Sequence, residues 1–343
     1  MVCRLEKNRV WRTYLGGKKI DAFDGAGEQQ DGHFPEDWVA STTVANNYGR
    51  EEQTEGLCLC KNGSALKEMI DSDPKKYLGQ RQVEKHGEQM SILVKLLDSA
   101  ERLVIQAHPT IEFAKRHFKS PRGKAECWYI INADEGACIY LGFKPGITEK
   151  QWTELFIRQD IEAMLKCLHK LPVTNGDVFF VDGGMPHAIG KGCMMVELQE
   201  ATDLMVIPER ITPGGIILSE EKMHGGIGFD NMFDCFDYTG YTLSELKSRY
   251  YRTFSAEPDS RCVLVGSDLT DKFRMEMYAV SNHLHIDYED TYVVAIVLDG
   301  YGEVQAGQHH TEIKKGDRLF IPAYDSKVLW KGMDNLKIVA CLP

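Results

Sequence analysis

The sequence lacks the features of a membrane or secreted protein. Its 343 residues contain no apolar run near the roughly 18–20 residues that a membrane-spanning helix needs. The first residues, MVCRLEKNRVWRTYLGG, hold no apolar segment typical of a signal peptide. The ten cysteines form no CxxC pair, so we expect neither a cysteine-based zinc site nor a thioredoxin-like motif. These absences predict a cytoplasmic protein with free thiols and no membrane partner.

An excess of positive charge is also missing. The chain has 40 basic and 51 acidic residues, which gives a net charge of −11. Proteins that bind nucleic acids gain affinity by neutralising phosphates, so we expect no nucleic-acid partner. A small anionic ligand is still compatible with this charge, because a local basic pocket can form in an acidic protein.

Most of the sequence patterns that are present are typical of β-strands. Short apolar runs are separated by glycines and polar residues, as in a sandwich or barrel. In the first half, we expect strands at 102–106, 128–132, 138–143, 177–181 and 194–198.

Helical patterns interrupt these strands. We expect helical insertions at about 61–98 and 148–171, and a further helix near 243–254. Thr148 with Gln151, and Thr242 with Glu245, have the spacing of capping boxes that begin two of these helices.

A β-rich unit is expected twice. The phrase GDVFFVDGGMPH at 176–187 has a counterpart, GDRLFIPAYDSK, at 316–327, and such a repeat predicts duplicated β-barrels. We expect an N-terminal unit at 1–215, a connecting segment with a helix at 216–255 and a C-terminal unit at 256–343. The second unit has Lys327 where the first has His187, and a lysine would repel a cation, so we expect no metal ligands there despite His283 and His285.

The first unit contains a set of candidate metal ligands. Gln106 and His108 are two residues apart, so on a strand they would point to the same face. Glu126 begins the next expected strand, and His187 follows a turn that contains proline. Two imidazoles, a carboxylate and an amide oxygen could hold zinc or a similar divalent ion.

These residues carry a resemblance to a known family. QxHP, GKxExWY, GDVFFxxxGxPHAIGKG and ELQ occur in this order, and the set resembles the type I phosphomannose isomerases (mannose-6-phosphate isomerases). The match is densest over 93–210, and WRTYLGG at 11–17 and PEDWVAS at 35–41 are similar as well. The resemblance implies a mainly β fold with two cupin (jelly-roll) β-barrels and helical insertions around the first, which would be catalytic. It also implies one zinc ion per chain, held by Gln106, His108, Glu126 and His187.

The resemblance implies further residues of the pocket. It assigns catalysis and substrate binding to Lys95, Lys124, Glu197 and an arginine. Family members carry that arginine ten residues after the glutamate, where this sequence has Ile207. Arg210 lies three residues further on, and a turn at Pro208 would direct it inward, so we expect Arg210 to bind the substrate and act in catalysis.

The implied reaction interconverts mannose 6-phosphate and fructose 6-phosphate. A proton moves between C1 and C2 through an enediol, and zinc would stabilise the developing negative charge. The proton-transferring base could be Glu197, Lys124 or a metal-bound water, whereas Arg210 and Lys95 are available for the phosphate.

Two other functions fit the same residues. An iron-dependent cupin oxygenase would use a similar shell of histidines and a carboxylate. A non-catalytic, zinc-containing relative could bind sugar phosphates without turning them over. Metal analysis separates the first alternative from the isomerase, and a turnover assay separates the second.

Overall fold

The chain folds into three antiparallel β-sheets with helices at their edges. The computed structural model describes residues 2–47, 49–50, 53–254 and 257–343. Strands predominate over helices in these ranges, so the predicted mainly β class is confirmed. None of the described helices combines the length and apolar content needed to cross a bilayer.

A seven-stranded sheet forms the centre of the molecule. Its strand order is β11 (Tyr251–Thr253), β8 (Asp177–Val181), β5 (Glu126–Ala133), β10 (Cys193–Glu200), β4 (Ile92–Asp98), β3 (Glu36–Val39) and β2 (Arg9–Val10). One face packs on a three-stranded sheet in the order β7 (Leu168–Pro172), β6 (Cys138–Phe143) and β9 (His187–Ile189). Trp128 and Met195 from the large sheet share a core with Leu141 from the small one.

The other face of the central sheet packs against the C-terminal unit. That unit is an eight-stranded sheet, in which the main path is β1 (Cys3–Arg4), β17 (Arg318–Ile321), β15 (Val293–Ala306), β18 (Lys327–Leu342), β13 (Arg274–Val280) and β12 (Ser260–Val265). β14 (His283–Asp287) pairs with β18, and β16 (His309–Lys314) pairs with β15. Val94 and Val196 of the central sheet share a core with Ile296 and Val339. Side chains alternate between faces along a strand, so β4 and β10 contribute to both cores.

The prediction of closed barrels needs correction. The strand pairings of the described residues leave the sheets open, with β2 and β11 at the ends of one sheet and β1 and β12 at the ends of the other main path. Large twisted sheets that pack face to face bury their apolar sides without closing into a ring of hydrogen bonds.

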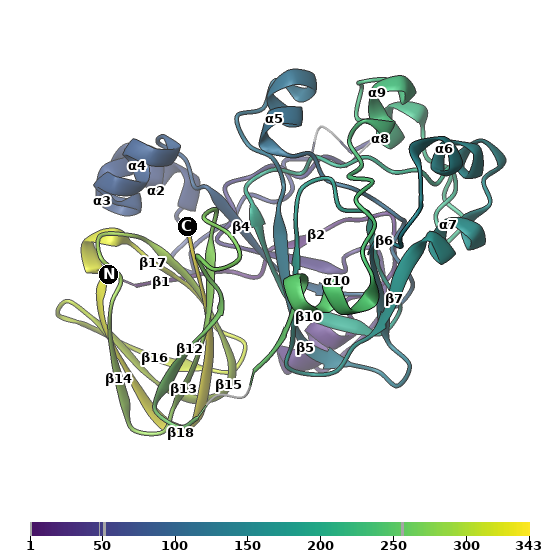
Figure 1. Ribbon diagram of the computed structural model, residues 1–343. Coiled ribbons are helices and arrows are strands. Elements are labelled where there is room, and N and C mark those ends of the chain that lie inside the picture. Colours follow the sequence, from purple (N-terminus) through teal and green to yellow (C-terminus); the bar gives the residue numbers. More distant parts are fainter. Residues whose placement is uncertain (1, 48, 51–52, 255–256) are drawn as a thin grey trace.

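Helices lie around the edges of both units (Figure 1). α2 (Leu66–Ser72), α3 (Pro74–Leu78) and α4 (Gln80–His86) form one group, and α3 contacts the short helix η2 (Ala323–Asp325) of the C-terminal unit. The remaining helical segments are α1 (Lys18–Phe23), α5 (Ile111–Phe113) continued by the π-helix η1 (Ala114–Phe118), α6 (Glu149–Arg158), α7 (Ile161–Cys167), α8 (Glu220–His224), α9 (Phe229–Phe233) and α10 (Leu243–Tyr250).

The expected strands of the first half are largely confirmed. Strands expected at 128–132, 138–143, 177–181 and 194–198 lie within β5, β6, β8 and β10. The prediction of a strand at 102–106 is wrong, because this segment lies outside the sheets. Within it, only Gln106 forms an isolated bridge, and its partner is His187.

The expected helices end earlier than the sequence patterns suggest. The insertion at 61–98 is helical only to His86, and 92–98 form β4, whose residues are all buried. A strand that is buried on both faces lacks the polar alternation that would distinguish it from a helix. The insertion at 148–171 is two helices followed by β7, and the helix expected at 243–254 ends at Tyr250. Thr148 does cap α6, and Thr242 and Glu245 form the expected capping box.

The division at 1–215, 216–255 and 256–343 stays a prediction, and two strands cross it. β1 at the N-terminus pairs with β17 of the C-terminal sheet, and β11 of the expected connecting segment pairs with β8 of the central sheet. Both chain ends accordingly lie on the C-terminal unit (Figure 1). The expected boundary between residues 255 and 256 lies outside the described residues.

A buried ion group joins the two units. Arg318 of β17 donates to Asp37 of β3 from Nη2 at 2.6 Å and from Nε at 3.0 Å, and it also pairs with Asp24. Lys7 contributes a second cation to Asp24 at 3.1 Å. The Arg318 and Asp37 side chains are almost fully buried, so neither charge is compensated by water.

Replacing this arginine should destabilise the fold strongly. In Arg318→Met the Asp37 carboxylate loses its cation inside the protein, and the free energy of unfolding should fall by about 3–5 kcal/mol. Chemical denaturation measures this loss. The control is Arg4→Met, because the Arg4 side chain is 36% exposed in its pair with Asp317 and should cost at most about 1 kcal/mol. Equal losses in the two variants would contradict the assignment.

Candidate metal centre and active-site cleft

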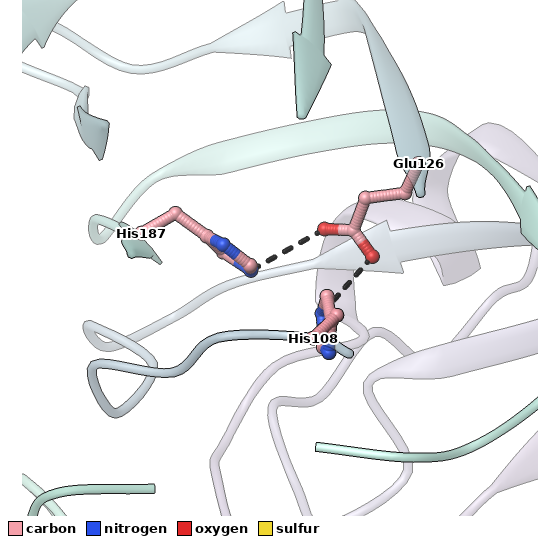
Figure 2. Close-up of side chains that lie close together, drawn as sticks. All are labelled: His108, Glu126 and His187. Carbon is pink, nitrogen blue, oxygen red and sulfur yellow. Dashed lines mark ion pairs between the residues drawn. The ribbon is translucent and has the colours of Figure 1, made fainter. Parts of the chain in front are cut away.

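Three predicted ligands converge inside the N-terminal unit (Figure 2). Glu126 lies between the two histidines, with Oε2 at 3.2 Å from His108 Nε2 and Oε1 at 3.4 Å from His187 Nε2. The ligand atoms of the three side chains all lie within 4.8 Å of one another, and all three residues are buried. This separation suits three ligands of one metal ion.

Local backbone pairing brings the ligands together. Gln106 and His187 exchange both main-chain hydrogen bonds, each 2.9 Å long, which places the segment before His108 against the start of β9. Glu126 is the first residue of β5. Gln106, the fourth expected ligand, lines a cleft next to this group, together with Lys95, Lys124 and Glu197.

The second nitrogen of each imidazole is held by a main-chain carbonyl. His108 Nδ1 lies 3.0 Å from the oxygen of Leu204, and His187 Nδ1 lies 2.9 Å from that of Met185. A carbonyl oxygen can only accept, so each Nδ1 carries the proton and each Nε2 presents its lone pair. Burial lowers the pKa of both histidines, that of His108 to about 3, which keeps the rings neutral as metal binding requires.

Two of the polar atoms that face one another lack a hydrogen bond. Glu126 Oε2 and His187 Nε2 are buried and have no hydrogen-bond partner among the described residues. Burial opposes ionisation of Glu126, but Lys124 and His108 hold its pKa well below the ordinary value, so the carboxylate stays charged. A buried carboxylate facing imidazole lone pairs is a donor set that a cation satisfies, and these residues therefore fit a metal cofactor.

Lys124 lies at the edge of this group. Its Nζ is 2.9 Å from His108 Nε2 and 3.3 Å from Glu126 Oε2. It also lines the cleft beside the ligands, so the predicted residue is placed at the site.

Lys95 and Glu197 both line the cleft and form an ion pair with each other. They lie directly opposite each other on β4 and β10, and Lys95 Nζ is 2.7 Å from Glu197 Oε1. Glu36 is a second carboxylate for the same ammonium, at 3.7 Å. Burial opposes the charge of Lys95, yet these two carboxylates raise its pKa and keep it protonated. Burial raises the pKa of Glu197, and the charge of Lys95 only partly offsets this effect.

The inward orientation expected for Arg210 is wrong. The Arg210 guanidinium lies over the rings of Phe156 and Phe229, at 5.2 and 5.4 Å, and its Nη1 is 3.3 Å from Glu220 Oε1. Its side chain is 42% exposed and is not part of the cleft lining. Aromatic stacking outside the cleft holds this arginine, whereas Ile207 lines the cleft itself.

Two cations that the sequence did not single out complete the cleft. Arg12 pairs with Glu36 at 3.0 Å and with Asp203 at 3.1 Å, and Lys222 is also part of the cleft lining. Arg12 lies in the WRTYLGG segment and Glu36 in the PEDWVAS segment, which carried the family resemblance without a role for either residue. Counting the space open to solvent, the cleft is about 690 Å³.

Removing one histidine should empty the metal site. His108→Ala and His187→Ala each delete one ligand of a small set, so the purified variants should lose most of the bound metal. Elemental analysis of the protein measures the metal content. His283→Ala and His285→Ala are the controls, because these histidines are exposed on β14, and they should leave the metal content unchanged. Loss of metal in the control pair alone would place the site in the other unit.

Comparison with known proteins agrees with this geometry. A model of the phosphomannose isomerase type I catalytic domain matches residues 34–143, which include five of the predicted site residues: Lys95, Gln106, His108, Lys124 and Glu126. A model of the mannose-6-phosphate isomerase cupin domain matches residues 268–341 of the C-terminal sheet.

Individual relatives extend the match over more of the chain. A mannose-6-phosphate isomerase of Bacillus subtilis is 36% identical over 248 residues, which are 69% of this chain and 70% of the relative. One from Streptococcus mutans is 28% identical over 253 residues, 73% of each chain.

Solved structures share the fold over nearly the whole length. The mannose 6-phosphate isomerase of Bacillus subtilis superposes with a TM-score of 0.75 at 20% identity, covering 99% of both chains. A putative mannosephosphate isomerase of Archaeoglobus fulgidus gives 0.74 at 19% identity, covering 99% of this chain and 97% of that one. Sequence identity over two thirds of a relative, together with the matching domain models, shows that the chain belongs to the type I phosphomannose isomerase family.

Proposed function

We propose that the protein is a zinc-dependent aldose–ketose isomerase that interconverts mannose 6-phosphate and fructose 6-phosphate through an enediol. The observation that carries the proposal is a buried pair, Lys95 and Glu197, in the lining of a cleft that also includes Lys124. Lys124 in turn contacts the metal-binding group of His108, Glu126 and His187. A sugar carbonyl and a transferable proton need these two kinds of group side by side.

Zinc suits the ligands better than a hard cation does. Two neutral imidazoles and one carboxylate are a common zinc set. We expect the side chain of Gln106, whose main chain pairs with that of His187, to supply a fourth donor. When bound, zinc would stabilise negative charge on the sugar oxygens during isomerisation. His108, Glu126 and His187 would hold it, with the histidine orientations fixed by their carbonyl partners.

Glu197 is our candidate for moving the proton between the two carbons. It is buried in the cleft, and its pKa is raised by burial, which brings a carboxylate closer to the proton affinity that a general base needs. Lys95 fixes the position of the carboxylate and offers further N–H donors to a sugar hydroxyl. Lys124 is engaged with His108 and Glu126, so we assign it to orienting the substrate beside the metal.

The organisation around this activity also belongs to the proposal. We infer that the central and three-stranded sheets form the catalytic unit and that the C-terminal sheet supports it from behind. The substrate is a small phosphosugar, and cytoplasmic location stays the expectation from the sequence.

Neutralising Glu197 should slow turnover while sparing the metal. Glu197→Gln keeps the size of the side chain but cannot take up a proton, so we expect kcat to fall by roughly 10²–10⁴-fold with the zinc content unchanged. A coupled assay with mannose 6-phosphate measures this rate. The matched control is Glu303→Gln, because Glu303 also lies opposite a lysine, Lys331, with the same 2.7 Å contact but in the C-terminal sheet.

The control should retain the wild-type rate. A near-wild-type rate in Glu197→Gln would remove this residue from the proton transfer. If the wild-type protein turned over no phosphosugar of a broad panel, or carried iron and consumed oxygen, the isomerase proposal itself would fail.

A further inference from the structure

Lys222 differs from the other cations of the cleft in its partners. Its Nζ donates to the main-chain oxygen of Asn46 at 2.8 Å, and no carboxylate of the described residues lies within ion-pair distance of it. Asp203 is the nearest acidic group to influence it, but that carboxylate accepts hydrogen bonds from Arg12 and from the Asn46 main chain.

Each of the other cations of the cleft already forms an ion pair with a carboxylate. Lys95 pairs with Glu197, Arg12 with Glu36, and Lys124 with Glu126, at distances of 2.7, 3.0 and 3.3 Å. A dianionic ligand that used those cations would have to share each of them with a carboxylate, which would repel it. Lys222 can instead turn two of its three N–H donors toward an incoming anion without losing a carboxylate partner.

The fold places Lys222 in the lining of the cleft. Val206 bridges to Ala107, next to His108, and the Ile207 N–H donates to the carbonyl of Met223 in α8 at 2.7 Å. This hydrogen bond holds α8 against the segment that contains Ile207, and Lys222 of α8 lines the cleft together with Ile207, which offers no charge. Lys222 also lines a second hollow, and its half-buried side chain is partly open to solvent.

We propose that Lys222 binds the phosphate group of the substrate at the mouth of the cleft and thereby selects phosphorylated sugars; this inference rests on the proposed function. Because the side chain is half-buried, its charge is partly desolvated and gains more from a phosphate than a surface lysine would. Burial also lowers the pKa of Lys222, as expected for an ammonium that lacks full compensation.

The test compares phosphorylated and unphosphorylated substrates on the zinc-loaded enzyme. In Lys222→Met, KM for mannose 6-phosphate should rise roughly 10- to 100-fold, the effect of losing a charge-assisted hydrogen bond, and kcat should change much less. Inhibition by inorganic phosphate should weaken by a similar factor, whereas turnover of free mannose should stay the same. Lys222→Arg should restore most of the affinity, because it keeps the charge.

The matched control is Lys144→Met. Lys144 Nζ also donates to a main-chain oxygen, that of Lys166 at 2.8 Å, but it lies outside the cleft and should leave every constant unchanged. Unchanged KM and phosphate inhibition in Lys222→Met would overturn the inference.

Direct binding separates this inference from the proposed function. If the wild-type protein isomerised no phosphosugar, calorimetry with inorganic phosphate would still decide the role of Lys222. Binding by the wild type that is lost in Lys222→Met would support the phosphate site while the isomerase proposal failed. Identical phosphate binding by both proteins, or none by either, would overturn the site.

Discussion

The need to compensate buried carboxylates organises this molecule. Glu36, Glu126 and Glu197 are all less than 5% exposed, and each lies beside at least one cation or imidazole. An unpaired charge at such a depth would cost several kcal/mol, so the positions of Arg12 and Lys95 are tied to those of the acids they face. The cleft is therefore a preorganised set of charges.

The central sheet can hold these buried charges because they lie on only one of its two faces. Its back is covered by the apolar face of the C-terminal sheet, so the front can carry charged residues without losing the main core. Trp38, Lys95, Glu197 and Trp128 lie in register across β3, β4, β10 and β5. The indoles flank the ion pair on both sides, which restricts its movement and excludes water from it.

The three candidate metal ligands are not positioned by the register of the sheet. Its ligands come from the first residue of a strand, from the first residue of another strand and from a segment outside the sheets. Such positions let three side chains approach one point, which neighbouring residues of one regular strand cannot do. Carbonyls of Leu204 and Met185 then select the histidine tautomers.

The sequence by itself determined the mainly β class, the family and the identity of the three convergent ligands, because ordered motifs and strand-like apolar runs are local properties of the chain. Tertiary structure decided the rest. β4 was expected as helix because both of its faces are buried, and Arg210 was expected in the cleft because a distance along the chain does not specify direction. The position of Lys222 in the cleft depends on contacts such as the hydrogen bond between Ile207 and Met223. Contacts between distant segments set these orientations, and no local pattern encodes them.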